Sequence, residues 1–265
     1  MDKLIASDGS INFIENDVME HRYVRRNREK ASFYVSSATG CNKLCKFCHL
    51  TATKQFRTQY YTNDDILYQV ENLWKHYLEQ EIADRLNINF MARGEPLSNI
   101  NLDADYLYDH INRIVDIPFR MNISTIIPTD IKNDLLYSDK TYIYYSLYSE
   151  NKTFREHWMT NAMDIDNAKV LLKKVKNPLT LHFALIKNQN DSFEDISNMI
   201  KSFLDIDYKV SLIRYNPYSI HEGEEADYPT TYNMVKQMFI NSGINCKIIE
   251  RVGYSAKASC GMFVE

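Results

Sequence analysis

Three cysteines lie close together in the stretch GCNKLCKFC, which runs from Gly40 to Cys48 and has the spacing C-x3-C-x2-C. Three thiolates at this spacing can each bind one iron of a [4Fe–4S] cluster and leave the fourth iron open to a substrate or cofactor. An open coordination position distinguishes a working metal site from a purely structural one. The stretch therefore predicts a reactive iron–sulfur centre whose ligands are Cys41, Cys45 and Cys48.

A zinc site is the alternative for the same stretch, with the ligands Cys41, Cys45, Cys48 and His49. Structural zinc sites usually combine two neighbouring ligands with a second pair far downstream. The sequence contains no such second pair, so the spacing favours the cluster.

Two further cysteines lie far from this stretch. Cys246 stands between the apolar residues Ile244 and Ile248 and is expected in the core. Cys260 is followed by Gly261 close to the end of the sequence, which suggests a residue on a tail that reaches into a site. A cysteine in such a place can act as a nucleophile if its thiol ionises, whereas the alternative is a small buried apolar residue.

The composition limits the class of protein. At 265 residues and 31.2 kDa the chain can form one large core of barrel size. No apolar run is long enough for a membrane span, and the first residues do not form a signal peptide. An odd number of cysteines without a secretory signal favours the reducing cytoplasm over a disulfide scaffold.

Helical and strand-like segments alternate after the cysteine stretch. Apolar residues recur at helical spacing in segments 62–79, 103–116, a segment beginning at Pro128, 164–175, 192–205 and 230–241. Strand-like patterns occupy 86–91, 119–124, 141–147, 179–186 and 209–215.

This alternation predicts an α/β fold with a parallel sheet and about six β–α units, fewer than the eight of a closed barrel. We expect a partial (β/α)6 barrel over residues 35–265, preceded by a short N-terminal β extension over residues 1–34. Polar motifs follow the predicted strands directly, at the edge where α/β barrels carry out their chemistry.

Basic residues are concentrated around the cysteine stretch. Residues 22–57 contain nine Lys or Arg and one acid, Glu29, although the whole chain has a net charge of −4. Such a concentration is typical of a surface that binds a polyanion, and ordinary solvated side chains are the equally weighted alternative.

The cysteine spacing resembles that of the radical S-adenosylmethionine (SAM) enzymes. Phe47 precedes the last cysteine as the aromatic residue of that family does, and Gly94-Glu95-Pro96 follows a predicted strand. The resemblance implies that the open iron binds SAM, that Phe47 packs near its adenine, and that Gly94 and Glu95 bind its ammonium group. In the family an electron from the cluster cleaves SAM to a 5′-deoxyadenosyl radical.

Further motifs resemble the RNA adenine methyltransferases of the RlmN/Cfr type. The stretch MARGEPLSN at 91–99 is similar to the family's M-G-M-G-E-P-L-x-N, and YVSSATGC at 34–41 to its C-V-S-S-Q-x-G-C. Four shorter matches follow in the family's order: IST at 123–125, SLY at 146–148 with Asn151 and Arg155, YNP at 215–217, and ASCG at 258–261. Before them, MEHRYV at 19–24 is similar to the family's V-E-x-V-Y-I.

The resemblance assigns roles to single residues. Ser124, Ser146, Leu147, Tyr148 and Asn216 would bind SAM, although Tyr148 replaces a histidine of the family. The glutamate that corresponds to Glu20 is a proton acceptor in the family, and a solvated surface acid is the alternative for Glu20.

Cys260 corresponds to the cysteine that takes a methyl group from a first SAM and carries it to an adenine carbon of RNA. The family releases the resulting adduct with a second cysteine, and this chain has Tyr34 in that place. A phenol forms no disulfide, so Tyr34 is expected to act as an acid, a base or a one-electron donor unless Cys246 substitutes. The family's N-terminal RNA-binding domain is not expected either, since only 34 residues precede the barrel.

The sequence therefore leads to a cytoplasmic, monomeric radical SAM methyltransferase that binds RNA through residues 22–57 and receives electrons from flavodoxin or ferredoxin. One alternative is direct hydrogen abstraction from a small molecule, nucleotide or peptide without methyl transfer. The other is a non-enzymatic metal protein that binds nucleic acid.

Overall fold

A computed structural model describes residues 1–27, 29–80 and 83–264, with side chains for 1–24, 29–80 and 83–264. Its strands are β1 (Asp2–Ile5), β2 (Ile11–Glu15), β3 (Met19–Asn27), β4 (Lys30–Tyr34), β5 (Arg85–Phe90), β6 (Phe119–Thr125), β7 (Thr141–Tyr145), β8 (Leu179–Ala184), β9 (Tyr208–Ile213) and β10 (Cys246–Ile248). Its helices are α1 (His49–Ala52), α2 (Asn63–Leu78), α3 (Ala104–Ile114), α4 (Lys152–Trp158), α5 (Ile165–Leu172), α6 (Phe193–Ser202) and α7 (Thr230–Asn241), with short 3-10 helices η1 (Pro96–Ser98) and η2 (Ile220–Glu222).

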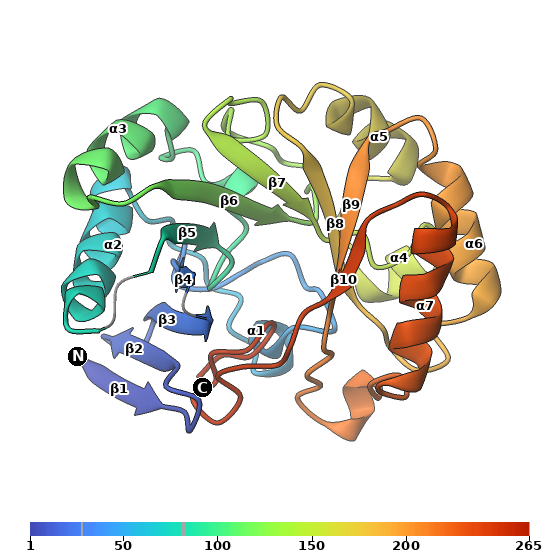
Figure 1. Ribbon diagram of the computed structural model, residues 1–265, viewed down its shortest axis with the longest axis horizontal. Coiled ribbons are helices and arrows are strands. Elements are labelled where there is room, and N and C mark those ends of the chain that lie inside the picture. The colour runs from blue at the N-terminus through green and yellow to red at the C-terminus, as the bar shows by residue number, and fades with distance from the viewer. Residues whose placement is uncertain (28, 81–82, 265) are drawn as a thin grey trace.

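Within these residues, ten strands form one sheet in the order of the chain, from β1 to β10. The strands from β1 to β4 pair antiparallel, and those from β4 to β10 pair parallel. Among the described strands β1 and β10 are the edges, so the curved sheet is an open barrel (Figure 1). The predicted partial α/β barrel with an N-terminal β extension is therefore confirmed.

Strand β4 belongs to both parts of the sheet. It pairs antiparallel with β3 and parallel with β5. The predicted division after residue 34 thus falls at the end of a shared strand, and it remains a prediction.

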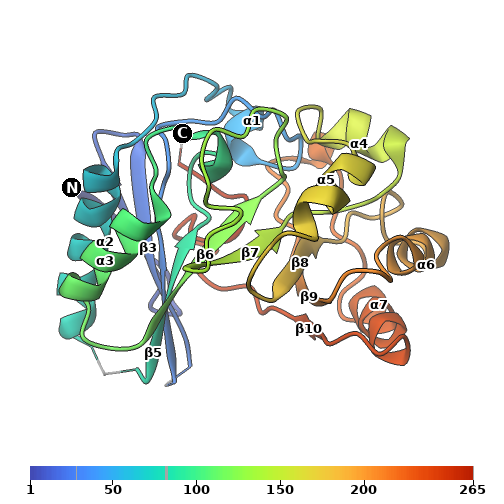
Figure 2. The ribbon, with the colours of Figure 1, turned by 90° about the horizontal axis from the view of Figure 1, so that it is seen from above.

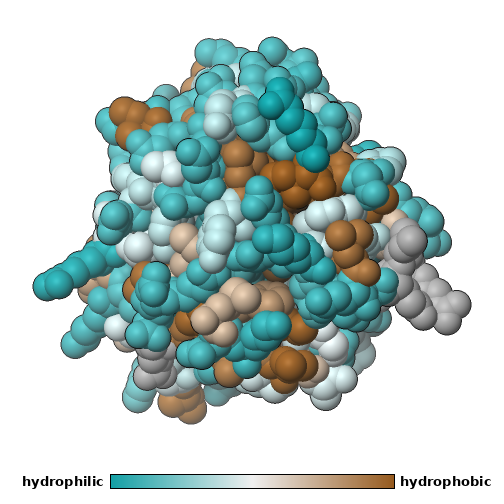
Figure 3. Space-filling view, turned by 90° about the vertical axis from the view of Figure 1, so that its left-hand side faces the viewer, coloured by the Kyte–Doolittle hydropathy of each residue, from teal (hydrophilic) through white to brown (hydrophobic). Residues whose placement is uncertain are grey.

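Helices cover the outside of the barrel in two groups (Figure 2). α2 and α3 lie side by side next to the N-terminal strands, and α6 and α7 lie side by side on the opposite flank. The face at the α2 and α3 end is largely hydrophilic, with small separated apolar patches (Figure 3). No helix in the described part of the chain is long and apolar enough to cross a membrane.

Helix α2 shows how local sequence specifies these elements. Thr62 and Asp65 form a capping box: each side chain accepts a hydrogen bond from the other's backbone N–H. The side chains at helical spacing from Ile66 to Tyr77 are buried and pack against the sheet. The helix therefore begins where the capping pattern predicts.

The helix predicted to begin at Pro128 is wrong, because residues 126–140 form an irregular loop between β6 and β7. Ile127 has a φ of 51°, in the left-handed region, and Pro128 forms a β-bridge with Ala162. Lys132 N donates to Leu97 O at 2.8 Å. Since these contacts use backbone groups that a helix needs for itself, tertiary structure overrides the local pattern.

Candidate active site

The cysteine stretch forms a loop that runs from the end of β4 to α1, at the edge where the parallel strands end. Two glycines give this loop its space. A Cβ at Gly40 would lie 2.4 Å from Arg57 O, and a Cβ at Gly94 would lie 2.4 Å from Ser37 Oγ. Gly94 also has a φ of +98°. Both positions therefore require glycine, Gly40 for space and Gly94 for space and backbone conformation.

The three predicted cluster ligands lie close enough to influence one another's ionisation. Burial and, second, the neighbouring Cys48 raise the pKa of Cys41 to about 12. Burial also raises the pKa of Cys48 to about 11 and that of Cys45 well above its ordinary value. Three neighbouring thiols in such a place become thiolates only beside compensating positive charge, which iron supplies. The donor set therefore fits an iron–sulfur cluster.

His49 does not join the cysteines as a metal ligand. Its Nε2 lies 3.1 Å from Asn216 O, and its ring packs edge-on against Tyr218. Among the residues that the structure describes, no group of three or more His, Cys, Asp or Glu side chains could hold a single metal ion. The contacts of His49 with Asn216 and Tyr218 thus argue against His49 as the fourth ligand of a zinc site.

Glu95 is a buried carboxyl beside this loop. It accepts hydrogen bonds from Leu97 N at 3.1 Å and Ile126 N at 3.2 Å. Burial raises the pKa of Glu95 to about 7, against the lowering effect of these donors and of Thr125. A cationic amine bound here would stabilise the carboxylate, so the residue is suited to an ammonium ligand.

Polar residues at the ends of β6 and β7 meet at the same edge of the sheet. Ser124 Oγ lies 3.4 Å from Ser146 Oγ, and both side chains are partly exposed. Leu147, by contrast, has a fully buried side chain, and its backbone N–H donates to Tyr145 O. The structure thus brings the two serines together and places Leu147 in the core.

Phe47 and Tyr148 form a stacked pair. Their ring centroids are 3.9 Å apart and their planes differ by 9°. Tyr148 has a φ of 57° and is buried. Burial, followed by the nearby Cys260, raises the pKa of its phenol well above the ordinary value. Tyr148 therefore occupies one face of Phe47 next to the cysteines.

A cavity of about 310 Å³ opens inside the curved sheet. Three predicted site residues line it: Tyr34, Asn216 and Cys260. Ser211 Oγ and Asn216 Oδ1 are buried without a hydrogen-bond partner within the described residues, so both can bind a ligand. The cluster cysteines lie outside the lining of this cavity.

Cys260 is carried by the segment 259–264, which has no regular secondary structure and lies beside α1 (Figure 1). Of the five cysteines, all within the described residues, only Cys260 is exposed. Its carbonyl accepts from Asn216 Nδ2 at 2.9 Å, and Gly261 O accepts from His49 N at 2.9 Å. The cluster loop and the Cys260 segment are therefore joined directly.

Comparison with known proteins agrees with this site. No protein-family model matches the chain. The chain is 27% identical over 98% of its length to a probable dual-specificity RNA methyltransferase RlmN of Prochlorococcus marinus, of which it covers 77%. It is 28% identical over 89% of its length to the RlmN of Aliarcobacter butzleri, of which it covers 67%.

The chain is a homologue of the RlmN enzymes. Its fold also matches the crystal structure of a radical SAM methyltransferase from Sphaerobacter thermophilus, with a TM-score of 0.81. That match covers 99% of this chain and 80% of the other at 19% identity. The open radical SAM barrel predicted from the sequence is thereby confirmed.

One residue at which the RlmN-like motifs differ from the family pattern lies in the cavity wall. Tyr34, which replaces the second cysteine, lines the cavity together with Cys260. Cys246 is buried on β10 and is not part of the cavity wall. The substitution thus changes the chemistry available inside the cavity, and Cys246 is not placed to compensate there.

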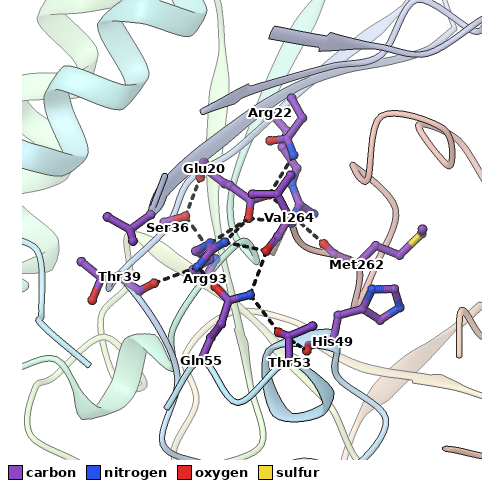
Figure 4. Close-up of polar contacts among 12 residues, drawn as sticks. Glu20, Arg22, Ser36, Thr39, His49, Thr53, Gln55, Arg93, Met262 and Val264 are labelled. Atoms are coloured by element: carbon purple, nitrogen blue, oxygen red, sulfur yellow. Dashed lines mark hydrogen bonds and ion pairs between the residues drawn. The ribbon is translucent and has the colours of Figure 1, made fainter. Parts of the chain in front are cut away.

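Glu20, predicted as a proton acceptor or a solvated surface acid, is fully buried, so the surface alternative is wrong. It lies between Arg22 and Arg93, with the nearest N–O distances 3.1 and 2.7 Å (Figure 4). Burial alone would raise the pKa of Glu20, but the two guanidinium groups more than offset this and hold it below its usual range.

The basic stretch 22–57 does not form one continuous surface. Arg22 and Lys43 are buried, and Lys43 pairs with Asp130 at 2.6 Å. Arg28 lies outside the described residues, as do the side chains of residues 25 and 26. Lys46, Lys54 and Arg57 remain exposed. Part of the predicted stretch therefore serves internal contacts.

The cavity wall contains basic residues, and sequence reasoning missed the four that lie outside the stretch 22–57. Six Lys or Arg and one acid, Glu250, line it; the basic residues are Arg22, Lys30, Arg85, Arg214, Lys247 and Arg251. They come from β3, β4, β5, the end of β9, β10 and the segment that follows β10. Their separate places in the sequence gave no signal, because only the curvature of the sheet brings them together.

Proposed function

We propose that this protein is a radical SAM enzyme that transfers a SAM-derived one-carbon unit through Cys260 to a nucleobase, with adenine in RNA as the expected substrate. The hydrogen bond from His49 N to Gly261 O carries the proposal. It connects the residue after the last cluster cysteine to the residue after Cys260, so a methyl donor bound at the cluster loop would lie near Cys260.

The donor groups divide into two sets. Cys41, Cys45 and Cys48 would hold a [4Fe–4S] cluster, which supplies single-electron reduction when bound. Gly94 and Glu95 would bind the ammonium group of SAM. Ser124, Ser146 and the Oδ1 of Asn216 would hydrogen-bond the rest of the molecule, while Leu147 could contribute only backbone contacts. Phe47, stacked on Tyr148, would pack against the adenine with its other face.

Cys260 would act as the nucleophile of the first step. Its thiol loses a proton, and the thiolate attacks the methyl carbon of SAM to give S-methylcysteine and S-adenosylhomocysteine. Because Cys260 is exposed at the cavity wall, the methylated side chain would face a base bound in the cavity. The basic residues of the wall other than the buried Arg22 would bind the phosphates of that substrate.

The experiment is anaerobic reconstitution with iron, sulfide and methyl-labelled SAM, followed by mass mapping of the peptide that contains Cys260. We expect label on Cys260 and its loss in Cys260→Ala. Cys246→Ala is the matched control, because Cys246 is buried outside the cavity and its removal should leave the label in place. Label on another residue, or no label, contradicts the proposal.

Tyr34 favours a second candidate, direct hydrogen abstraction without methyl transfer. It lines the cavity in place of the cysteine that releases the adduct. Deoxyadenosine formation without S-adenosylhomocysteine would identify this reaction in the same reconstitution. For either reaction we expect a cytoplasmic monomer that receives electrons from flavodoxin or ferredoxin.

A further inference from the structure

The group formed by Glu20, Arg22 and Arg93 has no exposed charge. The side chains of the three residues are 0%, 1% and 0% exposed to solvent. Removing three charges from water is so costly that such a group stabilises a fold poorly compared with apolar packing. Its presence therefore calls for a role other than stability.

The oxygens of Glu20 are fully occupied. Oε1 accepts from Arg93 Nε at 2.7 Å and from Val264 N at 3.1 Å. Oε2 accepts from Asn12 Nδ2 at 2.7 Å and from Arg22 Nη2 at 3.1 Å. A carboxylate has about four acceptor positions, and all four are used inside the protein. Glu20 has no position left to accept a proton from a substrate.

Both guanidinium groups also donate to one segment, residues 259–264, while Arg93 Nη1 donates elsewhere, to Thr39 O and Gln55 Oε1 (Figure 4). Arg22 donates to Met262 O at 2.6 Å and to Ser259 O at 3.4 Å. Arg93 donates to Val264 O at 3.0 Å. Gln55 Nε2 donates to the same carbonyl at 2.8 Å. The guanidinium of Arg22 also lies 4.7 Å from the centre of the Phe263 ring.

These contacts fix both ends of the segment that carries Cys260. The charged group holds Ser259 on one side and residues 262–264 on the other, while Asn216 and His49 hold the two carbonyls between them. Because the segment has no helix or strand of its own, these side chains replace secondary structure as partners of its backbone.

We infer that Glu20, Arg22 and Arg93 form an internal docking site for residues 259–264 that positions Cys260 at the cavity wall. This inference rests on the proposed role of Cys260. Glu20 and Arg93 are positioning residues in this arrangement, and Glu20 is not a catalytic base. Arg93 stands where the related motif M-G-M-G-E-P has a methionine, so this chain has a cation there that the motif lacks.

Hydrogen exchange measured by mass spectrometry on the full chain tests the docking directly. We expect the peptide that covers 259–264 to exchange at least tenfold faster in Glu20→Gln and in Arg93→Met. Arg155→Met is the matched control, because Arg155 is buried and donates to the carbonyls of Leu147, Ser149 and Met163 instead. It should change exchange of 259–264 less than twofold.

Methyl transfer to Cys260 separates positioning from acid–base catalysis. If Glu20 is a positioning residue, Glu20→Gln slows methyl transfer to Cys260 at least tenfold but leaves the shape of the pH–rate profile unchanged. Methyl transfer is also faster in Arg93→Lys than in Arg93→Met. Slow transfer with unchanged exchange of 259–264, or loss of an acidic limb in Glu20→Gln, overturns the inference.

The docking site and the proposed function can fail separately. If the wild type carries no label but exchange responds as expected, the docking site stands and the proposed function fails. If Glu20→Gln does not fold, Gln55→Ala removes a contact to Val264 O and one acceptor of Arg93 Nη1 but keeps all three charged residues, and it should raise exchange about threefold. No change in that variant contradicts the docking site.

Discussion

Two groups of charged residues in this molecule have the same composition, one glutamate between two arginines. Glu20 lies between Arg22 and Arg93, and Glu225 lies between Arg214 and Arg251, 2.5 and 2.9 Å away. They differ in exposure. The side chains of the first group are at most 1% exposed, and those of the second are 17–27% exposed.

Exposure decides what each group can do. In the Glu20 group every oxygen of the carboxylate and most N–H groups of the arginines bind the protein itself. In the Glu225 group both arginines line the cavity, and Arg214 also packs on the face of Tyr228 at 3.5 Å. Arg22 of the first group also borders the cavity, but its side chain is 1% exposed and bound by internal partners. The first group therefore organises the chain, whereas the second keeps more exposed cations within reach of a ligand.

The largest expected effect concerns the stability of the two groups. Glu20→Ala leaves two buried guanidinium groups without a counter-charge, which should lower the free energy of unfolding by about 3–5 kcal/mol. Glu225→Ala should cost about 1–3 kcal/mol, because water reaches that site. Urea denaturation measures both changes. Equal losses would show that exposure does not separate the two groups.

Binding of a short RNA should depend on the Glu225 group more than on the Glu20 group. Arg251→Gln removes one cation from the cavity wall, which should weaken binding about fivefold and reduce the slope of log K against log salt by about 1. Arg93→Met removes a cation that does not line the cavity and should leave that slope unchanged. Fluorescence anisotropy titrations at several salt concentrations measure both, and an equal slope change in Arg93→Met would contradict the assignment.

Acid should weaken both groups, the buried one more. Nearby arginines hold the pKa of Glu20 and that of Glu225 below the ordinary value of 4.5, against the effect of burial. The stability that these carboxylates contribute is present above pH 4.5 and is lost as pH falls through the lower pKa of the folded protein, since the unfolded chain then binds more protons.

At pH values below 4.5 the free energy of unfolding should therefore decrease, by at most about 1.4 kcal/mol per pH unit for each group. Glu20→Gln should flatten this fall more than Glu225→Gln does. His21 acts in a separate window, because burial lowers its pKa to about 4 and its contribution is lost between pH 6.5 and 4. Identical acid limbs in the two Gln variants would argue against the difference in exposure.

Local patterns predicted the elements well and their irregular connections poorly. The capping box at Thr62 and the apolar spacing after it fixed helix α2, since both depend on residues within one or two turns. The prediction of a helix after Pro128 was wrong, because the backbone of this segment bonds to residues distant in sequence, Leu97 and Ala162. Strand β10 was also missed, since three residues are too few to show a period.

The sequence by itself determined the alternation of strands and helices and the relationship to the RlmN enzymes, and it predicts Cys41, Cys45 and Cys48 as cluster ligands, because each depends on residue types at short, fixed spacing. Only the tertiary structure decided that Glu20 meets Val264, 244 residues away in the segment of Cys260, and that cations from separate strands and loops share one cavity. No period along the chain encodes such distant contacts, which arise when a curved sheet brings its edges and the final segment together.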